Sequence, residues 1–343
     1  MSAASFDLRA HLAAGQAIPA HPLALDTAGR LDERYQRALT RYYGAAGAGG
    51  IAVAVHTTQF AIREHGLLEP VLGLAADTLD EIEAGGRARM ARIAGVCGPT
   101  TQAVSEAALA RDRRYHAALV SYGGWGEASD DALLAHARAV GDVLPVFGFY
   151  LQPAVGGRPL GYDFWRRFVA LDRVVAIKIA PFDRYATLDV VRAIGDSGRS
   201  DVALYTGNDD SIIADLLTVF PNGRRMAGGL LGQWAVWTRR AVELVQEIKT
   251  QDAALPAPQW LARAAALTEA NAAIFDAANR FAGCIAGIQE VLHRQGLLRS
   301  TRCLDARDVL SPGQADAITR VCAAHPELRD DDFVQAHLDD WLR

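Results

Sequence analysis

Eight short apolar runs, separated by stretches compatible with helices, constrain the fold of this chain more than any other feature. Each run has the length of a strand, and apolar residues recur with helical spacing between most neighbouring runs. Continuous apolar strands are typical of a parallel sheet covered by helices, and eight such strands close into a barrel. The runs are His21–Leu25, Gly50–Val55, Ala91–Val96, Ala117–Tyr122, Leu144–Leu151, Val174–Ala180, Val202–Tyr205 and Met226–Leu231.

We therefore predict an α/β fold, a TIM (β/α)8 barrel with additional C-terminal helices. Residues 1–18 are predicted to form an N-terminal extension, residues 19–250 the barrel, and residues 251–343 a C-terminal helical region, with Gln233–Thr250 as the closing helix. A doubly wound open sheet is the alternative. The sequence disfavours it because no G-x-G-x-x-G motif follows the first run.

Composition and charge favour a small-molecule partner. The net charge of −5 comes without a basic stripe, which argues against nucleic acid. No apolar run approaches the roughly 18 residues of a membrane span, and the first residues do not resemble a signal peptide, so we expect a cytoplasmic protein without a membrane partner. The four cysteines lie far apart with no metal-ligand spacing, so we expect no metal.

Lys178 is the first candidate for chemistry, because it interrupts the sixth apolar run. Active sites of such barrels lie where the strands end at their carboxyl edge, and period-two alternation places Val174, Ala176, Lys178 and Ala180 on one face. The chain has only two lysines, Lys178 and Lys249. A buried ammonium can lose its proton and attack a carbonyl, whereas a guanidinium cannot. A lysine that snorkels or pairs with a carboxylate is the alternative.

Two further strand ends carry polar groups. Tyr150 shares a face with Val146 and Gly148, and its phenol could relay protons; packing in the core is the alternative. Thr57 and Thr58 follow the second run and offer hydroxyls suited to a carboxylate, although threonines at a strand end are also common.

The order and spacing of these residues resemble the dihydrodipicolinate synthase/N-acetylneuraminate lyase superfamily of class I aldolases, with this chain as a divergent member. The resemblance covers about residues 20–320 and includes an interval of twenty-eight positions from Tyr150 to Lys178. The matching motifs are Thr57-Thr58, Tyr150-Leu151-Gln152-Pro153, Lys178 and Gly207-Asn208-Asp209-Asp210.

The resemblance implies a role for each matching residue. Lys178 would be the Schiff-base lysine, Tyr150 the proton-transfer phenol and Thr57 its hydrogen-bonding relay partner. Thr58 would help hold the carboxylate of the keto acid. Gly207 and a backbone carbonyl near Leu230 would line the pocket behind the imine.

The resemblance also implies the partners. The substrate would be a small 2-oxo acid, no metal or organic cofactor would be needed because the protonated imine is itself the electron sink, and the chain would form a homo-oligomer, a tetramer or a dimer.

The chain departs from the family pattern in several places. His56 and Gln59 replace the glycines that usually flank the threonine pair, and Val155 stands where dihydrodipicolinate synthases place a substrate-binding arginine. Tyr122 is the nearest substitute for the tyrosine pair expected after the fourth strand.

Four other residues complete these expectations. Arg158, or Arg184 on the loop after the sixth strand, could clamp a second carboxylate or a sugar-acid chain. Asp209-Asp210 are expected to cap the following helix.

The predicted function is that of a Schiff-base-forming aldolase or lyase acting on pyruvate or a related 2-oxo acid, by carbon–carbon cleavage or condensation or by dehydration of a sugar-derived 2-oxo acid. Two alternatives stay open. One is a dihydrodipicolinate synthase, and the other is a non-catalytic barrel that binds a keto acid.

Overall fold

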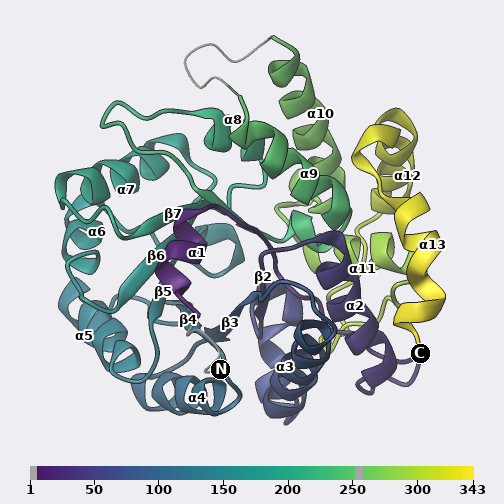
Figure 1. Ribbon diagram of the computed structural model, residues 1–343, viewed down its shortest axis with the longest axis horizontal. Coiled ribbons are helices and arrows are strands. Elements are labelled where there is room, and N and C mark those ends of the chain that lie inside the picture. The colour runs from purple at the N-terminus through teal and green to yellow at the C-terminus, as the bar shows by residue number, and fades with distance from the viewer. Residues whose placement is uncertain (1–5, 252–257) are drawn as a thin grey trace.

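The computed structural model describes residues 6–251 and 258–343, and it confirms the predicted (β/α)8 barrel (Figure 1). Eight parallel strands form one sheet in the order β1-β8-β7-β6-β5-β4-β3-β2. Backbone hydrogen bonds from Gly49 to Ala17 (3.0 Å) and from His21 to Ala52 (2.8 Å) join β2 to β1 and close the sheet. The strands are β1 (Ala17–Pro19), β2 (Gly50–Val53), β3 (Ala91–Val96), β4 (Ala117–Val120), β5 (Val146–Leu151), β6 (Val174–Ala180), β7 (Ala203–Thr206) and β8 (Gly228–Leu231).

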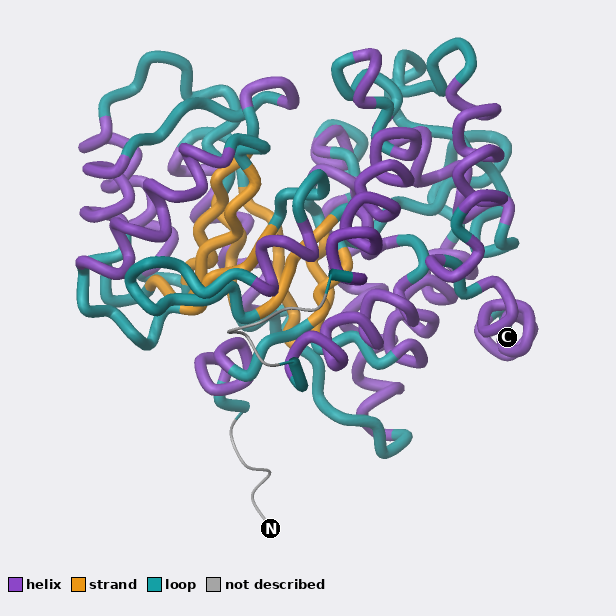
Figure 2. The backbone as a smooth tube through the Cα atoms, turned by 90° about the horizontal axis from the view of Figure 1, so that it is seen from above, coloured by secondary structure: helices purple, strands orange, loops and turns teal. Residues whose placement is uncertain are grey.

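Helices surround the barrel, and the C-terminal helices gather on one side of it (Figures 1 and 2). The predicted additional C-terminal helices are thus confirmed. The helices of the described residues are α1 (Leu8–Ala13), α2 (Glu33–Ala46), α3 (Leu68–Ala84), α4 (Thr100–Asp112), α5 (Asp130–Gly141), α6 (Tyr162–Phe168), α7 (Arg184–Asp196), α8 (Ile212–Leu217), α9 (Thr238–Lys249), α10 (Gln259–Ile274), α11 (Cys284–Arg294), α12 (Gln314–Ala324) and α13 (Asp331–Trp341). Short 3₁₀ helices are η1 (His56–Thr58), η2 (Phe60–Arg63), η3 (Pro153–Val155), η4 (Gln233–Ala235), η5 (Ala277–Asn279) and η6 (Pro326–Leu328).

Helix α1 lies across the amino-terminal end of the barrel, as Figure 1 shows. The side chain of Leu12 is fully buried among the residues that fill the barrel. The Tyr205 hydroxyl, on β7, donates to the Leu12 carbonyl (2.8 Å) and accepts from the Gln16 amide (3.2 Å). This end of the barrel is therefore closed by packing and by satisfied hydrogen bonds.

Apolar side chains form two clusters, one inside the barrel and one between the sheet and the helices. On β5, Phe147 and Phe149 belong to the inner cluster, whereas Val146 and Tyr150 belong to the outer one. Gly148 also faces outward, because a Cβ atom there would lie 2.6 Å from the Phe168 ring. The alternation expected for a strand is thus present, with Tyr150 on the face that contacts helices.

An irregularity in β6 changes which residues lie beside one another. Val146 pairs with Val174, but Phe147 pairs with Ala176, so Val175 is an extra residue of the kind found in a β-bulge. Val174 consequently packs in the outer cluster, while Ala176 and Ala180 face inward. The prediction that Val174 shares the face of Lys178 is wrong for this reason.

The first strand lies earlier than predicted. The predicted run His21–Leu25 is buried but is not a strand, and β1 occupies Ala17–Pro19, across the predicted boundary between the extension and the barrel. Pro22 has no N–H for a ladder, and the His21 ring bonds to Thr40 of α2 (2.9 Å). The segment therefore packs against α2 instead of pairing with a strand. Residues 1–5 of the predicted extension lie outside the described residues.

The chain after β8 follows the predicted order of elements. The predicted closing helix, Gln233–Thr250, is η4 followed by α9, with a break at Trp237, whose φ of 54° is left-handed. Residues 252–257, near the start of the predicted C-terminal region, lie outside the described residues. Within the part of the chain that the structure describes, no helix combines the length and the apolar character of a membrane span.

Candidate active site

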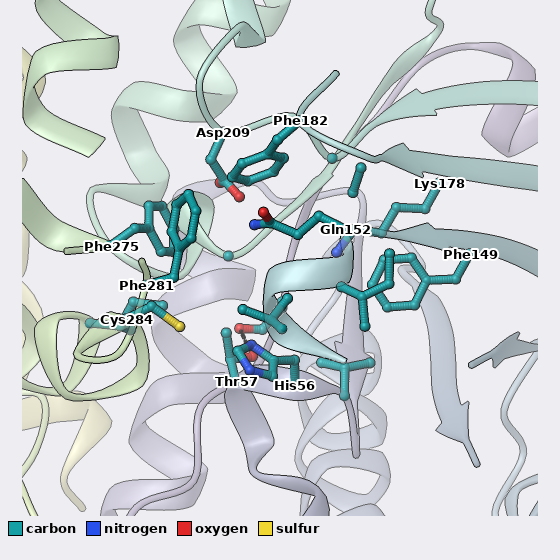
Figure 3. Close-up of a pocket in the computed structure, with 18 residues that line it drawn as sticks. His56, Thr57, Phe149, Gln152, Lys178, Phe182, Asp209, Phe275, Phe281 and Cys284 are labelled. Carbon is teal, nitrogen blue, oxygen red and sulfur yellow. Dashed lines mark hydrogen bonds between the residues drawn. The ribbon is translucent and has the colours of Figure 1, made fainter. Parts of the chain in front are cut away.

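A cavity opens at the carboxyl-terminal end of the barrel, opposite α1 (Figure 3). Its floor consists of residues on and after β2, β5, β6, β7 and β8. Its outer wall comes from the segment that joins α10 to α11 and from α11 itself. The lining residues are Ala20, Val55, His56, Thr57, Phe149, Leu151, Gln152, Val155, Lys178, Ala180, Phe182, Gly207, Asp209, Gly232, Phe275, Phe281, Cys284 and Ile288.

Lys178 projects from β6 into this cavity and is 8% exposed. Its Nζ lies 4.5 Å from the centroid of the Phe149 ring. Within residues 6–251 and 258–343 its ammonium makes no hydrogen bond and no ion pair, so the charge is held only by weak interactions. Burial lowers the pKa of Lys178 to about 8, although the nearby Asp209 carboxylate opposes that shift.

Gly207, at the end of β7, makes room for this lysine. A Cβ atom at Gly207 would lie 2.6 Å from Lys178 Cε and 2.7 Å from the Cβ of Ala180. Gly207 lines the cavity, as the sequence predicted, and only a residue without a side chain fits between these atoms.

Asp209 is the second buried ionisable group of the cavity. Its Oδ1 accepts a hydrogen bond from the Gln233 amide (3.1 Å), and its backbone carbonyl accepts one from the Asn271 side chain (2.6 Å). Figure 3 shows the carboxylate turned toward the cavity. Burial raises the pKa of Asp209 to about 7, and the attraction of Lys178 opposes the rise.

The predicted capping role of Asp209 and Asp210 is wrong. Helix α8 begins after Ser211, and no side chain caps it. Bonds to η4 and α10 turn Asp209 inward instead. The sequence interpretation missed this residue because acidic residues before a helix are usually caps.

His56 and Gln152 supply the other polar side chains that face Lys178 across the cavity. Burial, with a smaller contribution from Lys178, lowers the pKa of His56 to about 4, so its imidazole is neutral at neutral pH. Gln152, directly after β5, is 7% exposed, and Figure 3 shows its amide pointing into the cavity. In the described part of the chain no hydrogen bond satisfies that amide, which leaves it available to a ligand.

The threonine pair occupies η1 and is tied to the chain after β1. The Thr57 hydroxyl donates to the Ala20 carbonyl (2.9 Å), and the Thr58 hydroxyl donates to the His21 carbonyl (2.6 Å). Thr57 lines the cavity, but Thr58 does not. The expected relay from Thr57 to Tyr150 is absent, and the expected contact of Thr58 with a carboxylate has no support, because both hydroxyls already donate to backbone.

Tyr150 does not reach the cavity. Its hydroxyl accepts a hydrogen bond from the Leu160 amide (3.1 Å), and its ring packs 5.3 Å from the Trp165 ring in the helical layer. The pairing of Val146 with Val174 has an offset of twenty-eight positions, which would set Tyr150 beside Lys178. The extra residue Val175 changes the offset, so that Phe149 pairs with Lys178. Tyr150 therefore has no contact with the cavity in this structure, and the proton-transfer role expected of it stays a prediction.

Two other predicted binding residues lie away from the cavity. Leu230 is fully buried in the core of the barrel. Arg184, at the start of α7, donates to Asp215 (2.5 Å) and to the Ser211 hydroxyl (2.6 Å). This buried carboxylate fixes the guanidinium of Arg184. The predicted backbone carbonyl near Leu230 stays a prediction, and Gly232, two positions further on, lines the cavity.

The departures from the family pattern have structural counterparts. Val155 lines the cavity and supplies no charge, and Arg158 donates to the Ala128 carbonyl (2.8 Å) instead of entering the cavity. Tyr122 packs outward, with its ring 5.8 Å from that of Phe164. Among the described residues, no group of three or more His, Cys, Asp or Glu side chains is placed to hold a metal ion.

Fold and cavity together define a (β/α)8 barrel that carries a buried lysine on its sixth strand. No protein-family model matches the sequence, and no curated protein matches it in sequence. Solved structures, in contrast, match over nearly the whole chain.

Three of these similar structures are representative. A chloride-inhibited dihydrodipicolinate synthase from Acinetobacter baumannii, complexed with pyruvate, has a TM-score of 0.74 at 17% identity and covers 90% of this chain and 98% of its own. A prophage protein of the dihydrodipicolinic acid synthase family from E. coli K12, also with pyruvate, has a TM-score of 0.73 at 18% identity and covers 91% of this chain and 97% of its own. The protein CdNal from Clostridium difficile, with mannosamine, has a TM-score of 0.72 at 14% identity, covering 90% and 98%.

These likenesses establish the fold that the family resemblance implied. At such low identity they establish no residue's role, so the function is argued from the cavity itself.

Proposed function

We propose that this protein is a class I aldolase or lyase, in which Lys178 forms a Schiff base with pyruvate or a related 2-oxo acid. The observation that carries the proposal is a buried lysine in the cavity at the carboxyl end of a (β/α)8 barrel, where none of the described residues hydrogen-bonds to it. Active sites of this fold lie at that end. The two similar structures solved with pyruvate support a 2-oxo acid as the ligand.

The low pKa of Lys178 is what imine formation requires. Only the neutral amine attacks a carbonyl carbon, and a pKa of about 8 leaves about a quarter of the amines neutral at pH 7.5. An ordinary lysine, with a pKa of 10.5, leaves about one in a thousand. Attack by Lys178 forms a carbinolamine, and loss of water from it gives the iminium ion that withdraws electrons from the neighbouring carbon.

Asp209 is our candidate for moving protons at this imine. A group transfers protons best when its pKa lies near the working pH, and that of Asp209 is about 7. Its Oδ1 is fixed by the Gln233 amide, which orients the carboxyl group. His56 is neutral at the same pH and offers a ring nitrogen to the same cavity.

Gln152 is our candidate for holding the carboxylate of the keto acid. Its amide can donate two hydrogen bonds, is buried and has no protein partner among the described residues. Thr57 supports the floor beside it, and Gly207 provides the space in which Lys178 lies.

The two alternatives have less support. A dihydrodipicolinate synthase needs a cation for its aldehyde substrate, but Val155 occupies the expected position and Arg158 bonds to Ala128. A barrel that only binds a keto acid does not need a lysine that is costly to bury. A barrel that only binds a keto acid also leaves the lowered pKa of Lys178 and the raised pKa of Asp209 without a role.

Borohydride trapping tests the proposal. The protein is incubated with pyruvate and then with borohydride, and peptide mass spectrometry locates the reduced adduct. The chain has only two lysines, so the site of modification is unambiguous. We expect the adduct on Lys178 in the wild-type protein and in Lys249→Arg, and none in Lys178→Ala. A folded wild-type protein without an adduct from pyruvate or longer 2-oxo acids would refute the aldolase assignment.

We also propose a homo-oligomer, a dimer or a tetramer, on the basis of the sequence resemblance. Light scattering after size-exclusion chromatography measures it directly, because the monomer has a mass of 36.8 kDa.

A further inference from the structure

Three phenylalanines line the outer half of the cavity, away from Lys178. Phe182 follows β6, and Phe275 and Phe281 come from the segment between α10 and α11 (Figure 3). The Phe182 and Phe281 rings meet edge to face, with centroids 5.5 Å apart and an interplanar angle of 76°. Cys284 and Ile288 of α11 continue the same apolar wall.

Two of these three phenylalanines have an unusual backbone conformation. Phe182 and Phe281 have φ angles of 52° and 66°, in the left-handed region that bulky residues rarely adopt. Asp276 and Arg280 in the same connecting segment also have positive φ angles, of 57° and 55°. Strain of this kind persists where surrounding contacts enforce it, and it concentrates at ligand sites.

Hydrogen bonds to the Asp276 carboxylate hold the segment between α10 and α11 in this conformation. Its carboxylate accepts hydrogen bonds from the Gly283 amide (3.0 Å), the Asn279 side chain (2.7 Å) and the Ser311 hydroxyl (2.5 Å). The segment that presents Phe281 to the cavity is therefore fixed from within.

The charges of the cavity exclude an acidic group in its outer half. Lys178 and Asp209 are the only charged side chains among the lining residues, since His56 is neutral near pH 7. Arg158 and Arg184 do not line the cavity, and their guanidinium groups donate to Ala128 and Asp215. A second carboxylate on the substrate would find no cation there and would be repelled by Asp209.

We propose that the substrate carries an uncharged aromatic group, which lies against Phe182, Phe275 and Phe281 while its keto-acid end reaches Lys178. This inference rests on the proposed function and narrows its substrate class from 2-oxo acids in general to those with an aryl group. Edge-to-face and offset-stacked contacts of aromatic rings favour such a group over an extended, hydroxylated chain.

The corresponding cleavage balances without any further reactant. The Lys178 amine condenses with the keto group of a 4-aryl-4-hydroxy-2-oxobutanoate and releases water. The C4 hydroxyl then gives its proton to the Asp209 carboxylate, the C3–C4 bond breaks, and its electron pair moves into the iminium ion to form an enamine. The aryl aldehyde leaves, a proton returns to C3, and water hydrolyses the imine to pyruvate and free Lys178.

The test uses the reverse direction with three aldehydes of different chemistry. The wild-type protein receives pyruvate with benzaldehyde, glyceraldehyde or succinic semialdehyde, and liquid chromatography with mass spectrometry measures the aldol products. We expect kcat/KM for benzaldehyde to exceed the other two values at least tenfold. A protein that traps pyruvate on Lys178 but prefers another aldehyde, or uses none, would overturn the aryl assignment. A protein that traps no 2-oxo acid would instead overturn the proposed function.

Two variants of one aromatic residue sharpen the test. Phe281→Ala should lower kcat/KM for benzaldehyde about tenfold, chiefly through KM, and Phe281→Leu should lower it less because part of the apolar contact remains. Tyr185→Ala, which removes an aromatic ring that is 84% exposed on α7, is the matched control and should change nothing. Equal losses for all three aldehydes in Phe281→Leu would show a structural role and count against the proposal.

Discussion

The two lysines of this protein lie at opposite ends of the same barrel, in contrasting surroundings. At the amino-terminal end, Lys249 of α9 is exposed, and its Nζ donates to the Gly15 carbonyl (2.6 Å). At the carboxyl-terminal end, Lys178 is buried over the Phe149 ring without a hydrogen-bond partner among the described residues. The first lysine stabilises a closed end of the barrel, whereas the second is kept in a costly environment.

The same contrast extends to the neighbouring groups. Near Lys249, the Tyr205 hydroxyl both donates and accepts, so the polar groups closing that end satisfy one another. Near Lys178, the Gln152 amide is unsatisfied by the described residues, and burial disfavours the charged forms of both Lys178 and Asp209. The polar groups around Lys178 are thus less satisfied than those around Lys249, which is the pattern expected when a site is built for a reaction.

Substitution of each lysine by methionine should give the largest effects and tests directly whether the two lysines differ in function. Lys178→Met should abolish trapping and lower turnover at least a thousandfold, because no other amine of the described residues lines the cavity. It should also raise the free energy of unfolding by roughly 1 kcal/mol, since a poorly solvated charge is removed. Lys249→Met should keep trapping and lose roughly 1 kcal/mol with its hydrogen bond. Denaturant unfolding and trapping, measured on both variants, give the four values.

The pH dependence of stability provides an independent control for Lys178. The pKa of Lys178 is about 8 in the folded protein, and 10.5 is the ordinary value expected in the unfolded chain. Between pH 8 and 10.5 the unfolded chain therefore binds more protons than the folded protein. Wild-type stability should therefore rise with pH from about 8 to 10.5 relative to Lys178→Met. Parallel curves for the two proteins would contradict the burial of this amine.

Asp209→Asn should have the next largest effect on turnover, and it separates imine formation from the proton transfers that follow. Without the Asp209 charge the pKa of Lys178 falls further, so trapping near pH 7 should be as fast as in the wild type or faster. Turnover should nevertheless fall about a hundredfold, because the proton carrier is lost. The rate of trapping from pH 6 to 9, compared with kcat, measures both. Equal losses in trapping and turnover would mean that Asp209 only positions Lys178.

The sequence predicted the barrel and the lysine because both depend on local patterns. Seven of the eight apolar runs overlap strands of the sheet, and the lysine interrupts one of them. The first run, His21–Leu25, is not a strand, because β1 precedes it. Tyr150 was misplaced because the extra residue Val175 shifts the register of β6 by one position, and a run of apolar residues does not reveal which of them is extra.

Local sequence patterns could not predict the outer half of the cavity. Phe275 and Phe281 lie about a hundred positions after Lys178, and only the packing of the C-terminal helices brings them to the cavity. Asp209 was identified but assigned to a helix cap, since its bonds to Gln233 and Asn271 depend on contacts distant in sequence.

Gly207→Ala should have an intermediate effect on trapping. Gly207 directly follows β7 and lies beside the Lys178 side chain. The new methyl group would lie 2.6 Å from Lys178 Cε, so the lysine must change its rotamer, and trapping should slow about tenfold. Gly161→Ala is the matched control, because its Cβ atom meets nothing within 4 Å and its φ is −85°. Trapping rates for the two variants that agree within a factor of two would show that the space at Gly207 is not needed.

Tyr150→Phe should have the smallest effect on activity, and it decides between the structure and the motif. If the register of β5 and β6 is as described, the lost hydroxyl removes one hydrogen bond from the Leu160 amide, far from the imine. Stability should then fall by roughly 1 kcal/mol, while trapping and kcat change less than twofold. A hundredfold fall in kcat at unchanged stability would place the phenol beside Lys178. That result would mean that Tyr150, not Phe149, is the inward residue, and that the contrast between the two ends of the barrel includes a proton relay at the carboxyl end.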